Sequence, residues 1–359
     1  MARLDSFLKL VAEQHASDLH FHAGGVPMIR HDGELLPLPF RSLSELEARR
    51  FIEEILTPPQ LETLRREQQV DFMYVLPEVG RFRANVFLQS RGLGAAFRII
   101  RRRVPTLDDL GMPPAVRKLS ELTNGLVIVT GPTGAGKSTT LAAMLHEINQ
   151  NSERHVITIE DPIEFVHEPA KAAITHREVG THTESFAAGL RAALRESPDV
   201  LALGEMRDLE TVQLALQAAE TGVLVLGTLH TNSAAKAVDR ILDVIPEEGR
   251  EQARGTLSLS LRGVIAQRLV RLMSGDGRTA VLEVLIVNHG IANLIRENKV
   301  HQIEAQLQTN SADGTGNQGF DPALLRLVQE GVVEEQEALH TANYPELLKR
   351  QIAELPQER

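Results

Sequence analysis

Gly131-Pro132-Thr133-Gly134-Ala135-Gly136-Lys137-Ser138 decides the fold of this chain, because it matches the pattern G-x-x-x-x-G-K-[ST] at every fixed position. The apolar run from Leu126 to Val129 precedes it, and Thr139 to Leu145 has the pattern of a helix. A buried strand thus leads through a glycine-rich turn to a helix N-terminus, whose N–H groups favour phosphate. The predicted ligand is a nucleoside triphosphate.

Each part of this loop has a role in that interpretation. The glycines let the backbone approach phosphate oxygens, Lys137 reaches the β- and γ-phosphates, and the Ser138 hydroxyl suits a magnesium ion, Mg2+. A turn with only a structural purpose would need neither Lys nor Ser at these positions. The predicted nucleotide-binding residues are Gly131, Pro132, Thr133, Gly134, Ala135, Gly136, Lys137, Ser138 and Thr139.

Composition limits the class of protein. The 359 residues exceed one ordinary core, so two domains or more are expected. The absence of cysteine excludes disulfides and thiolate metal sites and fits a reducing compartment. No apolar run approaches the roughly 20 residues that span a bilayer, so we expect a cytoplasmic protein without a transmembrane segment.

The pattern along the chain predicts four parts. Residues 1–100 read as an α+β domain, with strands at 18–22 and 81–88 and a helix at 44–55. Proline and glycine mark residues 101–114 as a linker. Apolar strands alternate with helical stretches over 115–270, which predicts an α/β core with a parallel sheet, and residues 271–359 read mainly as helices.

Four strand-like runs in the core are each followed by polar residues. The runs begin at Leu126, His155, Val200 and Val223. Ligands of open α/β sheets lie beyond the carboxyl ends of the strands, so the four following segments should meet at one triphosphate. These segments are 131–138, 160–164, 204–208 and 228–232.

Triphosphate hydrolysis needs a metal ion, a carboxylate that orients water, and positive charge for the transition state. Glu205 closes the third run, where P-loop enzymes usually hold magnesium, and Glu164 follows the second. We assign Glu205 to the metal together with Ser138, and Glu164 to the base, while the exchanged roles remain an alternative. For Glu160 and Asp161, capping of a helix that starts at Pro162 is the structural alternative.

His230 lies at the end of the fourth run. A lone histidine there is often only a polar residue with its hydrogen bonds satisfied. Because its strand end should converge on the phosphates, we interpret it as a γ-phosphate sensor.

Positive charge is concentrated in residues 81–103, which hold seven arginines and no acidic residue in a chain of net charge −10. Arg81 and Arg83 share one face of a strand, and Phe82 and its alternate neighbours fill the other. They either lie on a solvent-exposed face of the sheet without a catalytic role, or they reach the triphosphate of a neighbouring subunit as arginine fingers. The second alternative predicts a ring of subunits. Arg195 and Arg207 are alternatives for this role.

The run Arg101 to Arg103 also suggests nucleic-acid contact. The overall acidity and the aromatic content of 4% argue against it, so we expect no nucleic-acid partner. A RecA-like nucleic-acid motor and a non-motor subunit that modulates a second ATPase remain rival functions.

These motifs together resemble the secretion ATPases that drive type IV pili and type II secretion, most closely the PilT-like retraction motors. The resemblance covers nearly the whole chain. Besides the loop at 131–138 it is carried by these segments: Ala16-Ser17-Asp18-Leu19-His20, Gly80-Arg81-Phe82-Arg83-Ala84-Asn85, the aspartate box at 157–164, the atypical Walker B motif at 198–205 and the histidine box at 227–232.

The resemblance implies a PAS-like N-terminal domain, a RecA-like P-loop ATPase core, a helical C-terminal region and a homo-hexamer. It also implies ATP as the fuel, an inner-membrane pilus platform protein as the partner, and a position at the inner face of that membrane. The longer N-terminus and cysteine-rich zinc insertion common in extension and type II secretion motors are missing, which favours the retraction branch.

One departure concerns the C-terminal motif Ala-Ile-Arg-Asn-Leu-Ile of retraction motors. Here residues 290–295 read Gly-Ile-Ala-Asn-Leu-Ile, with Gly290 in the first place and Ala292 in place of arginine. ATP hydrolysis should survive this change, whereas coupling to pilus disassembly is put in doubt. An accessory retraction ATPase that works with a paralogous pilus ATPase is therefore a further hypothesis.

Overall fold

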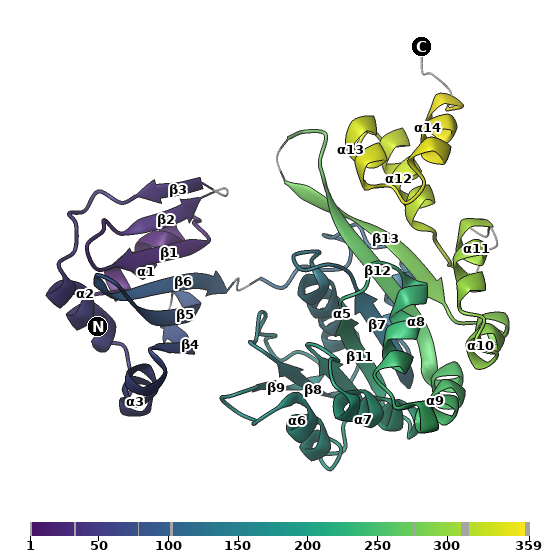
Figure 1. Cartoon of the computed structure of the whole chain (residues 1–359), viewed down its shortest axis with the longest axis horizontal. Helices are drawn as coiled ribbons and strands as arrows, with labels where there is room; N and C mark the ends of the chain where they lie inside the picture. The colour runs from purple at the N-terminus through teal and green to yellow at the C-terminus, as the bar shows by residue number, and fades with distance from the viewer. Residues whose placement is uncertain are drawn as a thin grey trace. The chain divides into compact units, whose positions relative to one another are not determined.

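The computed structural model describes residues 2–31, 34–77, 79–100, 103–275, 277–309 and 316–355. The chain divides into two compact units, Met1–Arg103 and Val104–Arg359, which we describe separately (Figure 1). Three predictions from the sequence lie partly outside the described residues. They are the arginine run at 101–103, a turn that Gly275-Asp276-Gly277 predicts, and a loop that the glycines within residues 311–319 predict.

The first unit is a six-stranded antiparallel sheet in the order β3-β2-β1-β6-β5-β4, with three helices. Its strands are β1 (Asp18–His22), β2 (Met28–His31), β3 (Glu34–Pro37), β4 (Gln69–Leu76), β5 (Gly80–Gln89) and β6 (Gly92–Ile100). Its helices are α1 (Asp5–Glu13), α2 (Glu45–Glu53) and α3 (Pro58–Glu67). The two predicted strands and the predicted helix are therefore confirmed.

Local chemistry explains the start of α2. The Ser44 hydroxyl accepts from the backbone N–H of Glu47, and the Glu47 carboxylate accepts from the N–H of Ser44 at 3.0 Å. This capping box satisfies two N–H groups that the first helical turn leaves free. The helix can therefore begin at Glu45.

Strand β5 has one buried and one exposed face. Phe82, Ala84 and Val86 are fully buried in the core of this unit, and Arg81 and Arg83 are exposed. The predicted division of faces holds as far as Val86. Leu88, which we expected inside, is 49% exposed because the core no longer covers this end of the strand.

The second unit contains a seven-stranded sheet in the order β13-β12-β7-β11-β10-β8-β9. All neighbours are parallel except β12 and β13, which are antiparallel. The strands are β7 (Gly125–Thr130), β8 (His155–Glu160), β9 (Ala173–Glu178), β10 (Val200–Leu203), β11 (Leu224–Leu229), β12 (Leu261–Arg271) and β13 (Arg278–Ile286). This is the predicted RecA-like α/β core.

The four predicted strands correspond to β7, β8, β10 and β11. The fourth continues to Leu229, three residues beyond the expected end, because residues 224–229 pair with β7 over its whole length. Thr228 therefore lies inside the strand, and His230 follows it directly.

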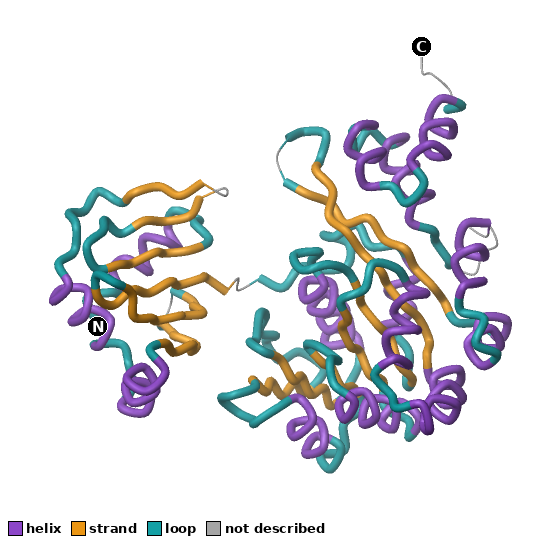
Figure 2. The backbone as a smooth tube through the Cα atoms, viewed as in Figure 1, coloured by secondary structure: helices purple, strands orange, loops and turns teal. Residues whose placement is uncertain are grey.

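Helices cover both faces of this sheet (Figure 2). α4 (Pro114–Ser120) and α5 (Lys137–Asn151) pack on the face formed by Val127, Val129 and their alternate neighbours. The opposite face, with Leu126 and Ile128, is covered by α6 (Phe186–Ala193), α7 (Leu209–Glu220), α8 (Ala234–Asp243) and α9 (Glu247–Ser260). Both faces are apolar, as a buried parallel sheet requires.

The C-terminal region begins with a strand rather than a helix. Residues 278–286, expected in a helical region, form β13 because their run of valine, leucine and isoleucine pairs with β12 along its length. The helices that follow are α10 (His289–Arg296), α11 (His301–Thr309), α12 (Phe320–Gln329), α13 (Glu335–Thr341) and α14 (Pro345–Ala353). Among the described residues, no helix has the length and apolar character needed to cross a membrane.

Candidate active site

The loop after β7 has a backbone that only glycine adopts readily. Gly131, Gly134 and Gly136 have φ values of 151°, 79° and 85°. A Cβ atom on Gly131 would collide with the carbonyl oxygen of Gln267, so this position also excludes side chains by space. The loop then enters α5 at Lys137, with the N-terminal end of the helix beside it.

Lys137 connects the loop with two predicted catalytic residues. Its ammonium group donates to the carbonyl oxygens of Gly131 and Pro132, both at 3.0 Å, and to Nδ1 of His230 at 3.3 Å. Because an ammonium group only donates, His230 accepts at Nδ1 and carries its proton on Nε2. Nε2 lies 3.3 Å from Oε1 of Glu205. Lysine, histidine and glutamate thus form one chain of contacts.

Glu205 follows β10 and also pairs with Arg207. Burial raises the pKa of the Glu205 carboxyl, but the hydrogen bond and charge of Arg207 and the hydrogen bond of His230 outweigh it, and the net pKa is lowered. Burial lowers the pKa of Lys137, and the charges of Glu205 and Glu164 oppose that shift. The site therefore keeps a carboxylate and an amine in mutual electrostatic contact.

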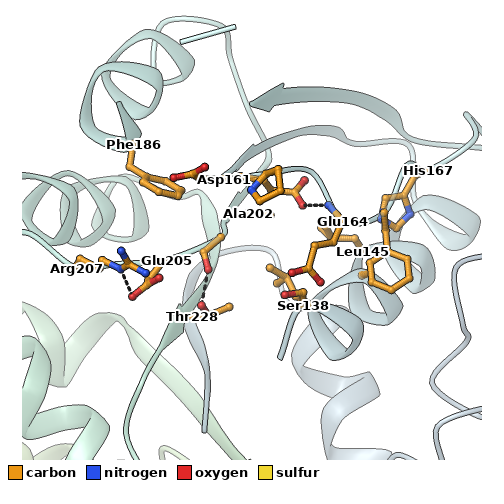
Figure 3. A pocket seen from close by; sticks show the side chains of 16 residues that line it. Ser138, Leu145, Asp161, Glu164, His167, Phe186, Ala202, Glu205, Arg207 and Thr228 are labelled. Carbon is orange, nitrogen blue, oxygen red and sulfur yellow. Dashed lines mark hydrogen bonds and ion pairs between the residues drawn. The ribbon is translucent and has the colours of Figure 1, made fainter. Parts of the chain in front are cut away.

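Glu164 reaches the same cavity from the loop after β8. Figure 3 shows its carboxylate directed toward Ser138, while Glu205 lies with Arg207 across the cavity. The loop is not a helix start: residues 161–172 contain no helix, so the capping role considered for Glu160 and Asp161 is wrong. The Glu160 carboxylate instead accepts from the N–H of Glu164 at 3.5 Å.

The cavity is lined by oxygen groups suited to a hard cation. The Ser138 hydroxyl and the carboxylates of Asp161, Glu164 and Glu205 all reach it. Within the described part of the chain, no group of three or more His, Asp or Glu side chains is arranged to hold a metal alone. Mg2+ prefers oxygen ligands, and it usually takes one or two from a protein and completes its shell with phosphate and water.

Two supporting residues were missed by the sequence reasoning. The Thr130 hydroxyl donates to the carbonyl of Thr231 at 2.9 Å and accepts from its N–H at 2.9 Å, which joins the ends of β7 and β11. The buried Glu178 accepts from the N–H of Ile163 at 3.0 Å and so fixes the loop that carries Glu164. Each is the last residue of its strand, Thr130 of the apolar β7 and Glu178 of the more polar β9, and only Thr130 stands out in the sequence as a polar end to an apolar run.

Three histidine rings stack on one another at the loop that follows β8. The His167 ring stacks on His176 at 5.7 Å and on His146 at 6.5 Å. Nδ1 of His167 is buried without a hydrogen-bond partner. Burial, with the charges of His176 and His146, lowers the pKa of His167 to about 3. His167 is therefore held neutral.

Arg81 and Arg83 belong to the other unit. Both side chains are exposed on β5, and Arg83 forms an exposed ion pair with Asp71 at 3.9 Å. The site of the second unit brings Lys137 and Ser138 together with the predicted catalytic residues Glu164, Glu205 and His230. The two arginines are not part of that unit.

A family model described as "Type II/IV secretion system protein" matches residues 2–338. The chain belongs to this family. It is 46% identical over 343 residues to the type IV pilus retraction ATPase PilT of Pseudomonas aeruginosa, covering 96% of this chain and 99% of that protein. The type IV pilus ATPase PilU of the same organism is 38% identical, over 94% of this chain and 88% of that protein.

The fold of a solved relative agrees with this assignment. A crystal structure of the pilus retraction motor PilT with bound ADP matches 98% of this chain and 99% of its own, with a TM-score of 0.90 and 43% identity. The chain is thus a PilT-like ATPase of the secretion family, with a RecA-like core. This confirms the sequence predictions of fold class and of ATP hydrolysis.

Proposed function

We propose that this ATPase is the motor that powers type IV pilus retraction, and so twitching motility, by withdrawing pilin from the pilus base. The observation that carries the proposal is the contact chain of Lys137, His230 and Glu205 at three strand ends. It is the arrangement expected of a site that binds and hydrolyses a triphosphate. The match to PilT extends over nearly the entire chain.

We assign the following chemistry to the site. Residues 131–139 bind ATP, with Lys137 turning from its present carbonyl partners to the phosphates. Ser138 and Glu205 would hold Mg2+, which neutralises charge on the phosphates, and Glu164 orients the attacking water. The exchanged roles of Glu164 and Glu205 remain the alternative, because both carboxylates reach the cavity. His230 then senses the γ-phosphate.

The proposed working form is a homo-hexamer in the cytoplasm, docked on a platform protein at the inner-membrane face. In such a ring the N-terminal PAS-like domain, residues 1–100, presents Arg81 and Arg83 to the nucleotide of the neighbouring subunit. In this proposal residues 101–114 connect that domain with the core at 115–270, and residues 271–359 complete the subunit. The exposure of both arginines supports this assignment.

Pilus retraction in a strain that lacks this chain tests the proposal. We expect loss of retraction, rescue by the wild-type chain, and no rescue by Glu205→Gln. Normal retraction in the deletion strain would refute the role as principal motor. Stimulation of ATP hydrolysis by DNA or RNA would instead favour a nucleic-acid motor.

A second candidate function is that of an accessory retraction ATPase acting with a paralogous pilus ATPase. Ala292 favours it, because it replaces the arginine of the retraction motif at a half-buried position of α10. The variant Gly290→Ala/Ala292→Arg restores the motif. If the chain is accessory, the deletion strain should keep partial retraction, and this variant should raise the retraction force without changing ATP turnover.

A further inference from the structure

Strand β12 lies beside the phosphate loop, and it also contacts the C-terminal helices. Ala266 of β12 is in register with Thr130, the last residue of β7. The next residue, Gln267, is therefore level with the start of the loop. Consecutive residues of a strand point to opposite faces, so Gln267 and Arg268 face different sides of the sheet.

Gln267 holds the loop from the α5 side. Its side-chain N–H donates to the carbonyl of Ala135, and its Oε1 accepts from the Thr140 hydroxyl at 2.8 Å. The residue is only 2% exposed. One amide group thus joins the loop to the first turn of the helix that follows it.

The same residue sets the space available to two loop glycines. A Cβ atom on Gly136 would lie 3.2 Å from Nε2 of Gln267, and one on Gly131 would collide with the Gln267 carbonyl oxygen. The curvature of the loop therefore depends on where β12 places residue 267. This is a positioning role, since Gln267 acts through its contacts with the loop and with Thr140.

Arg268 holds the C-terminal helices from the opposite face. Its guanidinium donates to the carbonyl of Thr341 at 2.9 Å and to Oδ1 of Asn343 at 2.8 Å, where α13 ends. The guanidinium carbon lies 4.2 Å from the ring centroid of Phe320, at the start of α12. Arg268 also donates to the carbonyl of Asn232 at 3.4 Å, two residues after His230.

We propose that Gln267 positions the phosphate loop for nucleotide binding and that Arg268 links the same strand to α12, α13 and the segment leading into α14. A change in the loop when nucleotide binds shifts residue 267, and the peptide bond to residue 268 passes that shift to the helices. β12 thereby reports nucleotide occupancy to the C-terminal region. Such coupling requires that nucleotide binds the two arrangements with different affinity.

The two halves of this link are tested separately in the full-length protein. Variants of Gln267 and Thr140 test the first half, and a variant of Arg268 tests the second. Gln267→Met keeps the volume but leaves the Ala135 carbonyl and the Thr140 hydroxyl without their partner. We expect the Kd for a fluorescent ADP analogue to rise about 5- to 10-fold, a typical effect of losing a buried hydrogen-bonded amide. Thr140→Val breaks the same bridge from α5 and should raise the Kd in the same direction, whereas Thr140→Ser should not.

Hydrogen–deuterium exchange over residues 335–353, measured with and without ADP, tests the second half of the link, from Arg268 to the C-terminal helices. The wild-type protein should show a nucleotide-dependent change there. Arg268→Met should lose most of that change while its Kd for the ADP analogue stays within about twofold of wild type. Arg326→Met is the matched control, because Arg326 lies on α12 and pairs with Glu330 of the same helix. It should keep the response.

Several results would overturn the inference. A wild-type Kd in Gln267→Met would remove the positioning role. An unchanged nucleotide response in Arg268→Met, or no response in the wild-type protein, would remove the link. Loss of the response in Arg326→Met as well would show that it follows the stability of the helices rather than the contacts of Arg268.

Discussion

The carboxyl edge of the second unit's sheet and the arginine face of β5 are both rich in charge, but they differ in how that charge is partnered. At the sheet edge, Lys137 contacts His230, which contacts Glu205, which pairs with Arg207. On β5, Arg83 forms a long ion pair with Asp71, at 3.9 Å, and its side chain is 47% exposed. The first region is a chain of close contacts, and the second has a long, solvent-exposed ion pair.

This difference indicates which functions each region can perform alone. A site whose charged groups are mutually held is preorganised, and catalysis depends on such preorganisation. Exposed cations on a strand contribute little to the stability of their own unit. The arginine face should therefore matter for activity through a partner, and the sheet edge for both activity and folding.

The largest expected effect is on the arginine face. Arg81→Ala/Arg83→Ala should lower ATP turnover about 10³-fold if the arginines stabilise the transition state in a neighbouring subunit. Arg66→Ala, an exposed arginine of the same unit, serves as the control and should leave turnover unchanged. Mixing the double variant with Glu205→Ala subunits should recover part of the turnover, and no recovery would contradict action between subunits.

Two of the carboxylates that line the cavity, those of Glu164 and Glu205, should give the next largest effect. Glu164→Gln and Glu205→Gln should each lower turnover about 10²- to 10³-fold, as for the loss of one catalytic electrostatic group. Turnover measured over a magnesium titration separates their roles. Only Glu205→Gln should improve with excess magnesium, and improvement of Glu164→Gln alone would exchange the assignments.

The buried His167 should make stability depend on pH. Its pKa of about 3 in the folded chain lies below the unfolded value of 6.5, so the unfolded chain binds the extra proton between these pH values. Stability contributed by this site is therefore lost as pH falls below 6.5, by about 2 kcal/mol between pH 7 and pH 5.

Urea unfolding of His167→Phe at pH 7 and pH 5 measures this contribution. The variant should lose about 2 kcal/mol less than the wild-type protein on acidification. His301→Gln, an exposed histidine on α11, is the control and should follow the wild type. An equal pH dependence of wild type and His167→Phe would show that His167 is protonated in the folded chain.

The smallest expected effect is that of an exposed arginine, Arg83, which we compare with the supporting hydroxyl of Thr130. Thr130→Val leaves the N–H and carbonyl of Thr231 without their partner and should cost about 1–3 kcal/mol of unfolding free energy. Arg83→Ala should change it by less than about 0.5 kcal/mol. Thr130→Ser keeps the hydroxyl and should restore most of the loss. Equal costs for Thr130→Val and Arg83→Ala would contradict the contrast.

Local patterns were enough for much of the fold. The loop at 131–138, the existence of the four apolar strands and the alternation in β5 as far as Val86 were read correctly, because strand and turn preferences are expressed within a few residues. β13 was missed since its pairing with β12 is set by tertiary contact. The end of β11 was misplaced for the same reason, as its length follows that of β7.

The sequence by itself determined the ligand class and the ATPase family, and it predicted the residues of the site, because glycine, lysine and carboxylate have few substitutes at a phosphate site. Only the tertiary structure decided how they are held. The bond of Thr130 to Thr231 and that of Gln267 to Ala135 each join residues more than a hundred positions apart. Such contacts produce no periodic pattern in the sequence, since they depend on which strands lie side by side.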